Sequence, residues 1–109
     1  MADRSRAIIK DNFQNFQQFY PFYLKEHSNR TNRRLHLIGT TLVIILFVFS
    51  ILTQNFSLLV VLPVVGYGFA WVGHFFFEKN KPATFKHPFY SLQGDFQMWW
   101  DHVTGRFSF

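Results

Sequence analysis

The chain has 109 residues, which is long enough for one small domain and too short for two. Aromatic residues make up 21% of it, which excludes global disorder, and the lack of cysteine excludes a disulfide framework or a cysteine-based zinc site. The formal net charge of +5 points to nucleic acid or to an anionic membrane surface, and the placement of the charges separates these two partners.

The N-terminal flank, residues 1–34, has an amphipathic pattern. Apolar side chains recur there with helical spacing, at Ile9, Phe13, Phe16, Tyr20 and Tyr23, and glutamines fill the opposite side. This pattern predicts a helix that lies in the interface between membrane and water.

The centre of the chain carries no Asp, Glu, Lys or Arg over the 43 residues 35–77. A polar turn at 53–55 divides this stretch into a first span, 35–52, and a second span, 56–77. About 20 residues cross a bilayer, so the first span is slightly short and the second is long enough. Gly66, Ala70 and Gly73 place small residues on one face of the second span, where another helix can approach closely. We predict an all-α fold built on a membrane helical hairpin with two transmembrane helices.

The basic residues lie outside the hairpin, on the side where its two ends meet. The positive-inside rule therefore predicts that both termini are cytoplasmic. Contact with lipid headgroups then accounts for the net charge, so membrane lipid is an expected partner and nucleic acid is not.

The C-terminal flank, residues 78–109, predicts a second amphipathic helix beginning near Pro88. Its apolar stripe consists of Phe89, Leu92, Phe96, Trp99, Trp100 and Val103. We expect this helix to lie in the membrane interface as well, with its tryptophans at headgroup depth.

The histidines indicate the chemistry. His36 begins the first span and His74 lies near the end of the second, so an antiparallel hairpin brings them to the same membrane face, where His27 and His87 flank the spans. Four imidazoles on one face predict a metal site, because neutral imidazole binds iron, zinc, copper or nickel. His27 and His36 are nine residues apart and share a metal only if the helix breaks between them, for which 28–32 is suited.

Two other polar residues lie one helical turn from a histidine, and further charged residues lie near them. Asn32 lies one helical turn before His36. Glu78 lies one turn after His74 and is either a carboxylate ligand or an acceptor that orients the imidazole. Arg33 and Arg34 are either headgroup anchors or clamps for an anionic substrate. Asp95 is interpreted as an interfacial or capping group, with metal ligation as the alternative.

Two blocks around these histidines resemble the signature blocks of the fungal-type 2-hydroxy fatty acid dioxygenase family, small membrane proteins formerly known as a domain of unknown function. The first block, 26–39, contains His27, Asn32 and His36, and the second, 71–83, contains Gly73, His74, Glu78 and Pro82. The second block continues through His87, Pro88, Asp95 and Met98 in the manner of the short bacterial members. The fungal member is longer, with additional membrane segments between its blocks.

The resemblance implies a membrane-embedded dioxygenase that uses Fe(2+) and O2 to shorten a 2-hydroxy fatty acid by one carbon. It implies metal ligands among His27, His36, His74 and His87, with Asn32 and Glu78 as catalytic residues. Arg33, Arg34 and Lys79 are then the residues expected to bind the substrate carboxylate. The compact length and the bacterial-type block imply a bacterial inner membrane, or the endoplasmic reticulum in a eukaryote.

Two non-catalytic interpretations stay open from the residues alone. In one, the histidines pack helices or hold a structural metal. In the other, the protein is a carrier or an assembly factor for a larger complex. Homo-oligomerisation also stays open. Two spans without charge have few polar side chains to line a transport pathway, so a transporter would need several copies of the chain.

Overall fold

The computed structural model describes residues 13–109, and these residues are helical with no strand among them. Four α-helices carry the fold: α2 (Phe16–Lys25), α3 (Arg30–Thr53), α4 (Val61–Val72) and α5 (Pro88–Val103). The short segments η1 (Phe56–Val60) and η2 (Gly73–Glu78) extend α4 at both ends, and η3 (Ala83–Phe85) precedes α5. The predicted all-α fold class is confirmed. The start of the first amphipathic pattern, at Ile9, lies outside the described residues.

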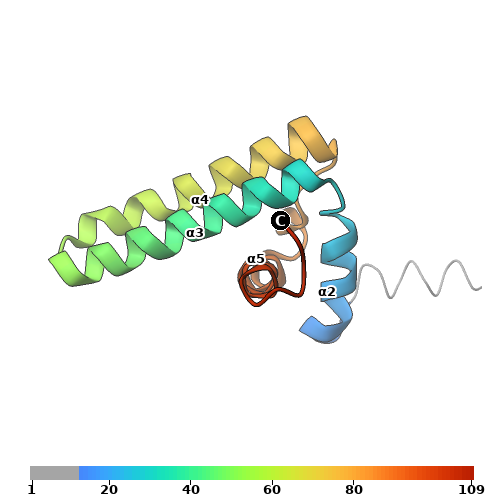
Figure 1. Cartoon of the computed structure of the whole chain (residues 1–109), viewed down its shortest axis with the longest axis horizontal. Helices are drawn as coiled ribbons and strands as arrows, with labels where there is room; N and C mark the ends of the chain where they lie inside the picture. Colours follow the sequence, from blue (N-terminus) through green and yellow to red (C-terminus); the bar gives the residue numbers. More distant parts are fainter. Residues whose placement is uncertain (1–12) are drawn as a thin grey trace, which may run out of the picture.

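Helices α3 and α4 form a long antiparallel hairpin (Figure 1). The first arm has 24 residues and the second, Phe56–Glu78, has 23, and both are long and apolar enough to cross a membrane. At 1.5 Å per residue such arms are about 36 Å long, against a hydrocarbon core of about 30 Å. The turn is polar as predicted, and Gln54 ends α3 in the left-handed conformation with a φ of 57°.

Large apolar side chains cover the outside of the hairpin. Leu52 is 77% exposed, Val60 75% and Val64 71%. A soluble helical bundle buries such side chains in its core, whereas lipid accepts them on the surface. The exposure pattern therefore favours a membrane hairpin over a pair of soluble core helices.

Small residues let the two arms approach each other. A Cβ atom added at Gly39 would lie 2.8 Å from Cβ of Phe69, and one added at Gly66 would lie 3.3 Å from Cγ2 of Val43. Ala70 and Gly73, on the small-residue face predicted for the second span, are buried. This face of α4 packs against α3.

Helices α2 and α5 lie together at the open end of the hairpin, on one side of it (Figure 1). Their shared core consists of Phe19 and Tyr23 from α2, Met98 from α5, and Ala83 from η3. Gly94 allows this packing, because a Cβ atom there would lie 2.8 Å from the Tyr23 ring. The two amphipathic helices thus pack on each other as well as beside the hairpin.

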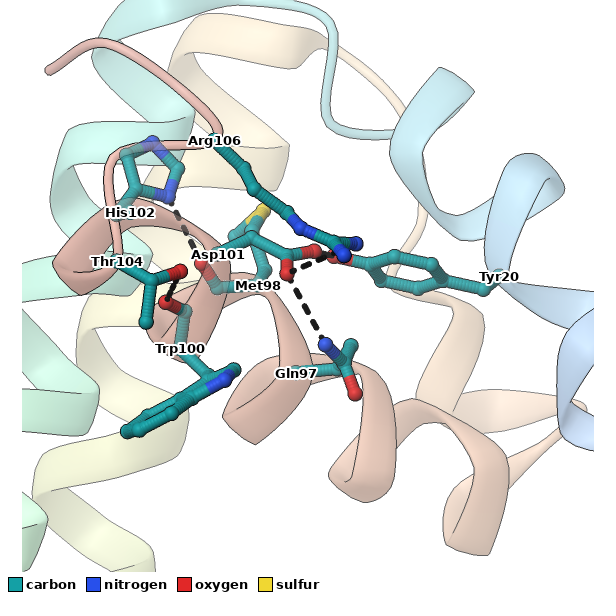
Figure 2. A network of polar contacts seen from close by, with 8 residues as sticks. All are labelled: Tyr20, Gln97, Met98, Trp100, Asp101, His102, Thr104 and Arg106. Atoms are coloured by element: carbon teal, nitrogen blue, oxygen red, sulfur yellow. Dashed lines mark hydrogen bonds and ion pairs between the residues drawn. The ribbon is translucent and has the colours of Figure 1, made fainter.

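A buried carboxylate joins the two helices (Figure 2). Asp101 on α5 is 2% exposed and accepts hydrogen bonds from the Tyr20 hydroxyl of α2 at 2.5 Å and from Nε2 of Gln97 at 3.0 Å. The Arg106 guanidinium lies 4.0 Å from the same carboxylate. Burial and the bond to Asp101 raise the pKa of Tyr20 well above its ordinary value, so its hydroxyl stays a donor.

The apolar stripe of α5 is exposed, with one exception. Phe89 is 85% exposed and Val103 57%, as expected of a helix that faces lipid. Trp99 is instead partly buried, and its indole N–H donates to the Thr41 hydroxyl of α3 at 3.0 Å. Trp99 therefore does not belong to the exposed stripe, because its side chain packs between α5 and the hairpin; its depth in the membrane stays a prediction.

Candidate metal centre

Three imidazoles meet at the open end of the hairpin, between the α2–α3 connection, the start of α3 and η2. His27 lies between α2 and α3, His36 on the second turn of α3, and His74 on η2, and all three are buried. Nε2 of His27 lies 3.1 Å from Nε2 of His36 and 2.9 Å from Nε2 of His74. The possible ligand atoms of the three residues all lie within 4.8 Å of one another.

A helix break brings His27 to this point, as the sequence predicts. The break covers residues 26–29, slightly earlier than the predicted 28–32, because α2 ends at Lys25 and the Asn29 side chain caps α3 by accepting from the backbone N–H of Asn32. The His27 ring stacks on Tyr23 with ring centroids 3.9 Å apart. The Arg33 side chain fixes the backbone of the break by donating from Nε to the His27 carbonyl oxygen at 2.5 Å.

Each imidazole is oriented through its other nitrogen. Nδ1 of His27 donates to the carbonyl oxygen of Tyr23 at 2.6 Å, and Nδ1 of His36 to that of Asn32 at 3.0 Å. Nδ1 of His74 donates to Oδ1 of Asn80 at 2.7 Å. Because oxygen acceptors fix the proton on Nδ1, the three Nε2 atoms carry lone pairs that face one another. A metal cation placed among them would accept all three lone pairs.

The protonation state of His27 agrees with this geometry. Burial lowers the pKa of His27 well below its ordinary value of 6.5, and the neighbouring His36 and His74 lower it further. The imidazole is therefore neutral at physiological pH, which is the form that binds a metal.

The segment that carries His74 is a π-helix, a form that occurs mostly as single-turn insertions in α-helices and frequently at functional sites. It ends at Lys79, which is left-handed with a φ of 62°. The backbone N–H of Asn80 then donates to the His74 carbonyl oxygen at 3.0 Å, and its side-chain amide donates to the Glu26 carbonyl oxygen. Asn80 thus links His74 to the helix break. Nothing in the spacing of Asn80 along the sequence marks it as a partner of His74.

Glu78 lies beside the start of α3 rather than among the imidazoles. Its Oε1 accepts from the backbone N–H of Asn29 at 2.8 Å and from Nδ2 of Asn32 at 3.0 Å, and its Oε2 accepts from the Ser28 hydroxyl. A carboxylate at a helix N-terminus is favoured by the helix dipole. Glu78 therefore anchors the helix break to the second arm, and it neither joins the three-histidine group nor orients an imidazole directly.

Asn32 connects this anchor to the metal centre. Its carbonyl oxygen accepts a hydrogen bond from Nδ1 of His36, and its side-chain amide donates to Oε1 of Glu78. The Asn32 side chain is fully buried. Its Oδ1 has no hydrogen-bond partner, and a Cβ atom added at Gly73 would lie 2.0 Å from it. The two arms are in close contact at this point, and only glycine fits at position 73.

His87 does not reach the other three histidines, so the expected group of four is corrected to three. The η3 turn places His87 at the cap of α5, and its ring packs against Phe13, Phe19 and Phe22 with centroids 5.3, 5.5 and 6.5 Å away. Spacing along the chain placed His87 on the correct side of the hairpin, but the direction of its side chain is set by packing against α2.

The three cationic residues expected to bind substrate lie around the centre and not in it. Arg33 holds the His27 carbonyl and lies over the Phe107 ring, 5.2 Å from its centroid. Arg34 donates to the Phe109 carbonyl oxygen at 2.9 Å. Lys79 ends η2 and is exposed. The cavity lined by the three histidines includes none of these cations.

That cavity has a volume of about 10 Å³, with Tyr23, Pro82, Ser91 and Asp95 in its wall. Such a volume holds about one water molecule or one ion. The Tyr23 hydroxyl donates to Asp95, and burial raises the pKa of the Asp95 carboxyl to about 7 although this hydrogen bond lowers it. Asp95 is therefore a polar group at the edge of the centre, on the side that faces α5.

The family model described as "2-hydroxy-palmitic acid dioxygenase Mpo1-like" matches residues 13–107 of the chain. No curated protein and no solved structure matches the chain. The match covers both signature blocks and every described residue of the three-histidine centre.

Proposed function

The chain belongs to the 2-hydroxy-palmitic acid dioxygenase Mpo1-like family, and on that premise we propose that it is a membrane-embedded, iron-dependent dioxygenase acting on 2-hydroxy fatty acids. The observation that carries the proposal is the set of three inward-facing Nε2 lone pairs of His27, His36 and His74. Three neutral imidazoles leave coordination positions free, as non-haem iron oxygenases require.

The reaction balances with O2 as the only other reactant. A 2-hydroxy acid and O2 give the acid one carbon shorter, CO2 and water. The bond between carbons 1 and 2 breaks, carbon 2 is oxidised to a carboxyl group, and O2 is reduced. Bound Fe(2+) would supply the redox chemistry, together with sites for O2 and for the hydroxyl and carboxylate oxygens of the substrate.

The protein's own residues orient the ligands and exclude water. The Tyr23 and Asn32 carbonyl oxygens and the Asn80 amide oxygen fix the three tautomers. The cavity has room for about one water molecule or ion, which limits the amount of water beside the reacting atoms. We assign Arg33 to positioning, since it acts on His27 through the backbone, and Glu78 and Asn32 to holding the helix break against η2.

The lipid-facing surface supports placement of this centre at the membrane. The histidines lie at the open end of the hairpin, since His36 is on the second turn of α3 and His74 is on η2. His36 shares a groove with Leu92 and Phe96 of the apolar stripe of α5. A fatty acid is concentrated in the bilayer, so a site at this depth meets its substrate there. We propose that both termini are cytoplasmic, in the inner membrane of a bacterium or in the endoplasmic reticulum of a eukaryote.

The test is product analysis on purified protein in detergent. We expect protein loaded with Fe(2+) in air to convert 2-hydroxypalmitate to pentadecanoate, and to do so neither without iron nor without O2. His27→Ala, His36→Ala and His74→Ala should each abolish iron binding and conversion. His102→Ala is the matched control, because His102 lies on α5 outside the group.

Metal content separates the alternatives. Stoichiometric metal without conversion of any 2-hydroxy acid would favour a structural metal in a non-catalytic protein. Stoichiometric iron in His36→Ala and His74→Ala would reject this centre as the binding site.

A further inference from the structure

We infer that a groove between α3, α4 and α5 holds the acyl chain of the substrate, and that Gly66 determines how far the chain extends along it. The inference rests on the proposed function, because it takes the occupant to be the substrate of the neighbouring centre. It assigns a binding site and a specificity-determining residue.

The groove has a volume of about 240 Å³ and its walls are mainly apolar. Each of the three helices contributes to the walls, with Val43 from α3, Leu62, Pro63 and Tyr67 from α4, and Leu92 and Phe96 from α5. An apolar cleft with a few polar groups at one end is the usual form of a site for an amphiphilic ligand.

The polar end of the groove meets the metal centre. His36, Ala70 and Asp95 line both the groove and the small cavity of the three histidines. Thr40, one turn after His36, adds a hydroxyl at this end. A ligand with its carboxyl and hydroxyl oxygens at the histidines would therefore enter the groove directly with its carbon chain.

The other end of the groove points into the membrane. From Ala70 back to Leu62 the groove follows eight residues of α4, which is about 12 Å of helix, toward the turn of the hairpin. A chain lying there runs alongside the apolar arms, in the same direction as the acyl chains of a surrounding bilayer. Headgroup-sized polar ligands do not fit walls of this composition, whereas a fatty acyl chain does.

Gly66 stands at the middle of this path. Gly66 and Val43 both line the groove, and a Cβ atom at position 66 would already lie 3.3 Å from Cγ2 of Val43, so a longer side chain would narrow the groove between α3 and α4. Gly68 provides a matched control on the same helix. It is exposed, and a Cβ atom there meets nothing within 4 Å.

The first experiment compares Gly66→Leu with Gly68→Leu on 2-hydroxyoctanoate and 2-hydroxypalmitate. We expect Gly66→Leu to lower kcat/KM for the long acid relative to the short one by at least tenfold, and Gly68→Leu to leave that ratio within twofold of the parent. Leu92→Trp narrows the groove from the half-exposed wall of α5, and it serves as the second variant if Gly66→Leu does not fold.

The second experiment does not depend on iron. A palmitate analogue with a diazirine near its methyl end is photo-crosslinked to metal-free protein, and the labelled residues are mapped by mass spectrometry. We expect labels around Leu62 and Val43 in the parent and in Gly68→Leu, and their loss in Gly66→Leu.

The two experiments separate failure of the groove from failure of the reaction. Labelling of the groove without turnover of any 2-hydroxy acid would contradict the proposed dioxygenase and support the acyl site. Turnover with an unchanged chain-length ratio in both groove variants, or labelling only outside the groove, would overturn the acyl site.

Discussion

The three imidazoles depend on residues that are not themselves ligands. Two of the acceptors that hold Nδ1 are backbone carbonyls, at Tyr23 and Asn32, and mutation of those side chains leaves the acceptor atom in place. The third acceptor is the Asn80 side chain, which makes His74 the imidazole whose orientation depends on a single replaceable group.

Asn80→Ala should therefore weaken metal binding. Outer partners of metal-bound histidines typically contribute about 10–100-fold in affinity, and we expect a loss in that range, because the His74 ring loses the acceptor that fixes its tautomer. Asn80→Asp, which keeps an oxygen acceptor, should retain most of the affinity. The measurement is competition for Fe(2+) against a chelator. Asn55→Ala, at the far turn of the hairpin, is the control and should bind like the parent. Equal affinity in the parent and Asn80→Ala would contradict this role.

The lowered pKa of His27 predicts how the metal-free protein responds to acid. The folded chain binds a proton at His27 less readily than the unfolded chain, whose pKa is near 6.5. The contribution of His27 to the free energy of unfolding is complete above pH 6.5 and is lost as the pH falls toward the lower pKa of the folded state. The Tm of metal-free protein should decrease below pH 6.5, and less steeply in His27→Gln. Parallel decreases in both proteins would show that other groups control the response.

At the scale of the elements, the metal centre is held by contacts between segments distant in the sequence. Glu78 at the end of the second arm accepts three hydrogen bonds from residues 28–32 at the start of the first. The π-helix and the helix break are each irregular, and each is stabilised by the other. This coupling predicts that a change in helix spacing affects the metal site without touching a ligand.

Gly73→Ala tests this coupling. The added Cβ atom would lie 2.0 Å from Oδ1 of Asn32 and 3.3 Å from its Cα, so the arms must separate. We expect a loss of about 1–3 kcal/mol in stability, typical of overpacking, together with weaker iron binding. Gly68→Ala makes the same chemical change where no atom lies within 4 Å and should be neutral. Unchanged Tm and iron occupancy in Gly73→Ala would show that the arms do not pack as described.

At the scale of the whole molecule, the three-histidine centre and the turn of the hairpin lie at opposite ends. Helices α2 and α5 lie at the open end of the hairpin (Figure 1). The metal centre lies there too, because His36 is near the start of α3 and His74 is on η2, whereas the turn at Gln54 is at the opposite end. Basic residues flank the open end, and residues 53–55 carry no charge. From this charge distribution the positive-inside rule predicts that the open end is cytoplasmic.

The absence of cysteine makes this orientation directly measurable. Single-cysteine variants Gln54→Cys and Ser108→Cys are exposed to a membrane-impermeant maleimide in intact cells. We expect labelling of Gln54→Cys and protection of Ser108→Cys, with the pattern reversed in inverted vesicles. Labelling of both variants from the same side would exclude a hairpin that crosses the membrane.

The sequence by itself determined the all-α class, the two apolar arms, the polar turn and the break that brings His27 toward His36. These features depend on composition and on spacing along one segment, and short windows of sequence encode both. The resemblance of the two blocks also led to the family that the family model matches over residues 13–107.

Only the tertiary structure decided which polar side chains meet. It turned His87 toward the aromatic side chains of α2, placed Glu78 at the cap of α3, and brought Asn80 to His74. It also turned Trp99 inward and showed Asp95 at the junction of groove and metal centre. The physical reason is that spacing fixes the face of a helix, whereas the rotation of each helix and the path of each loop follow from packing against distant segments.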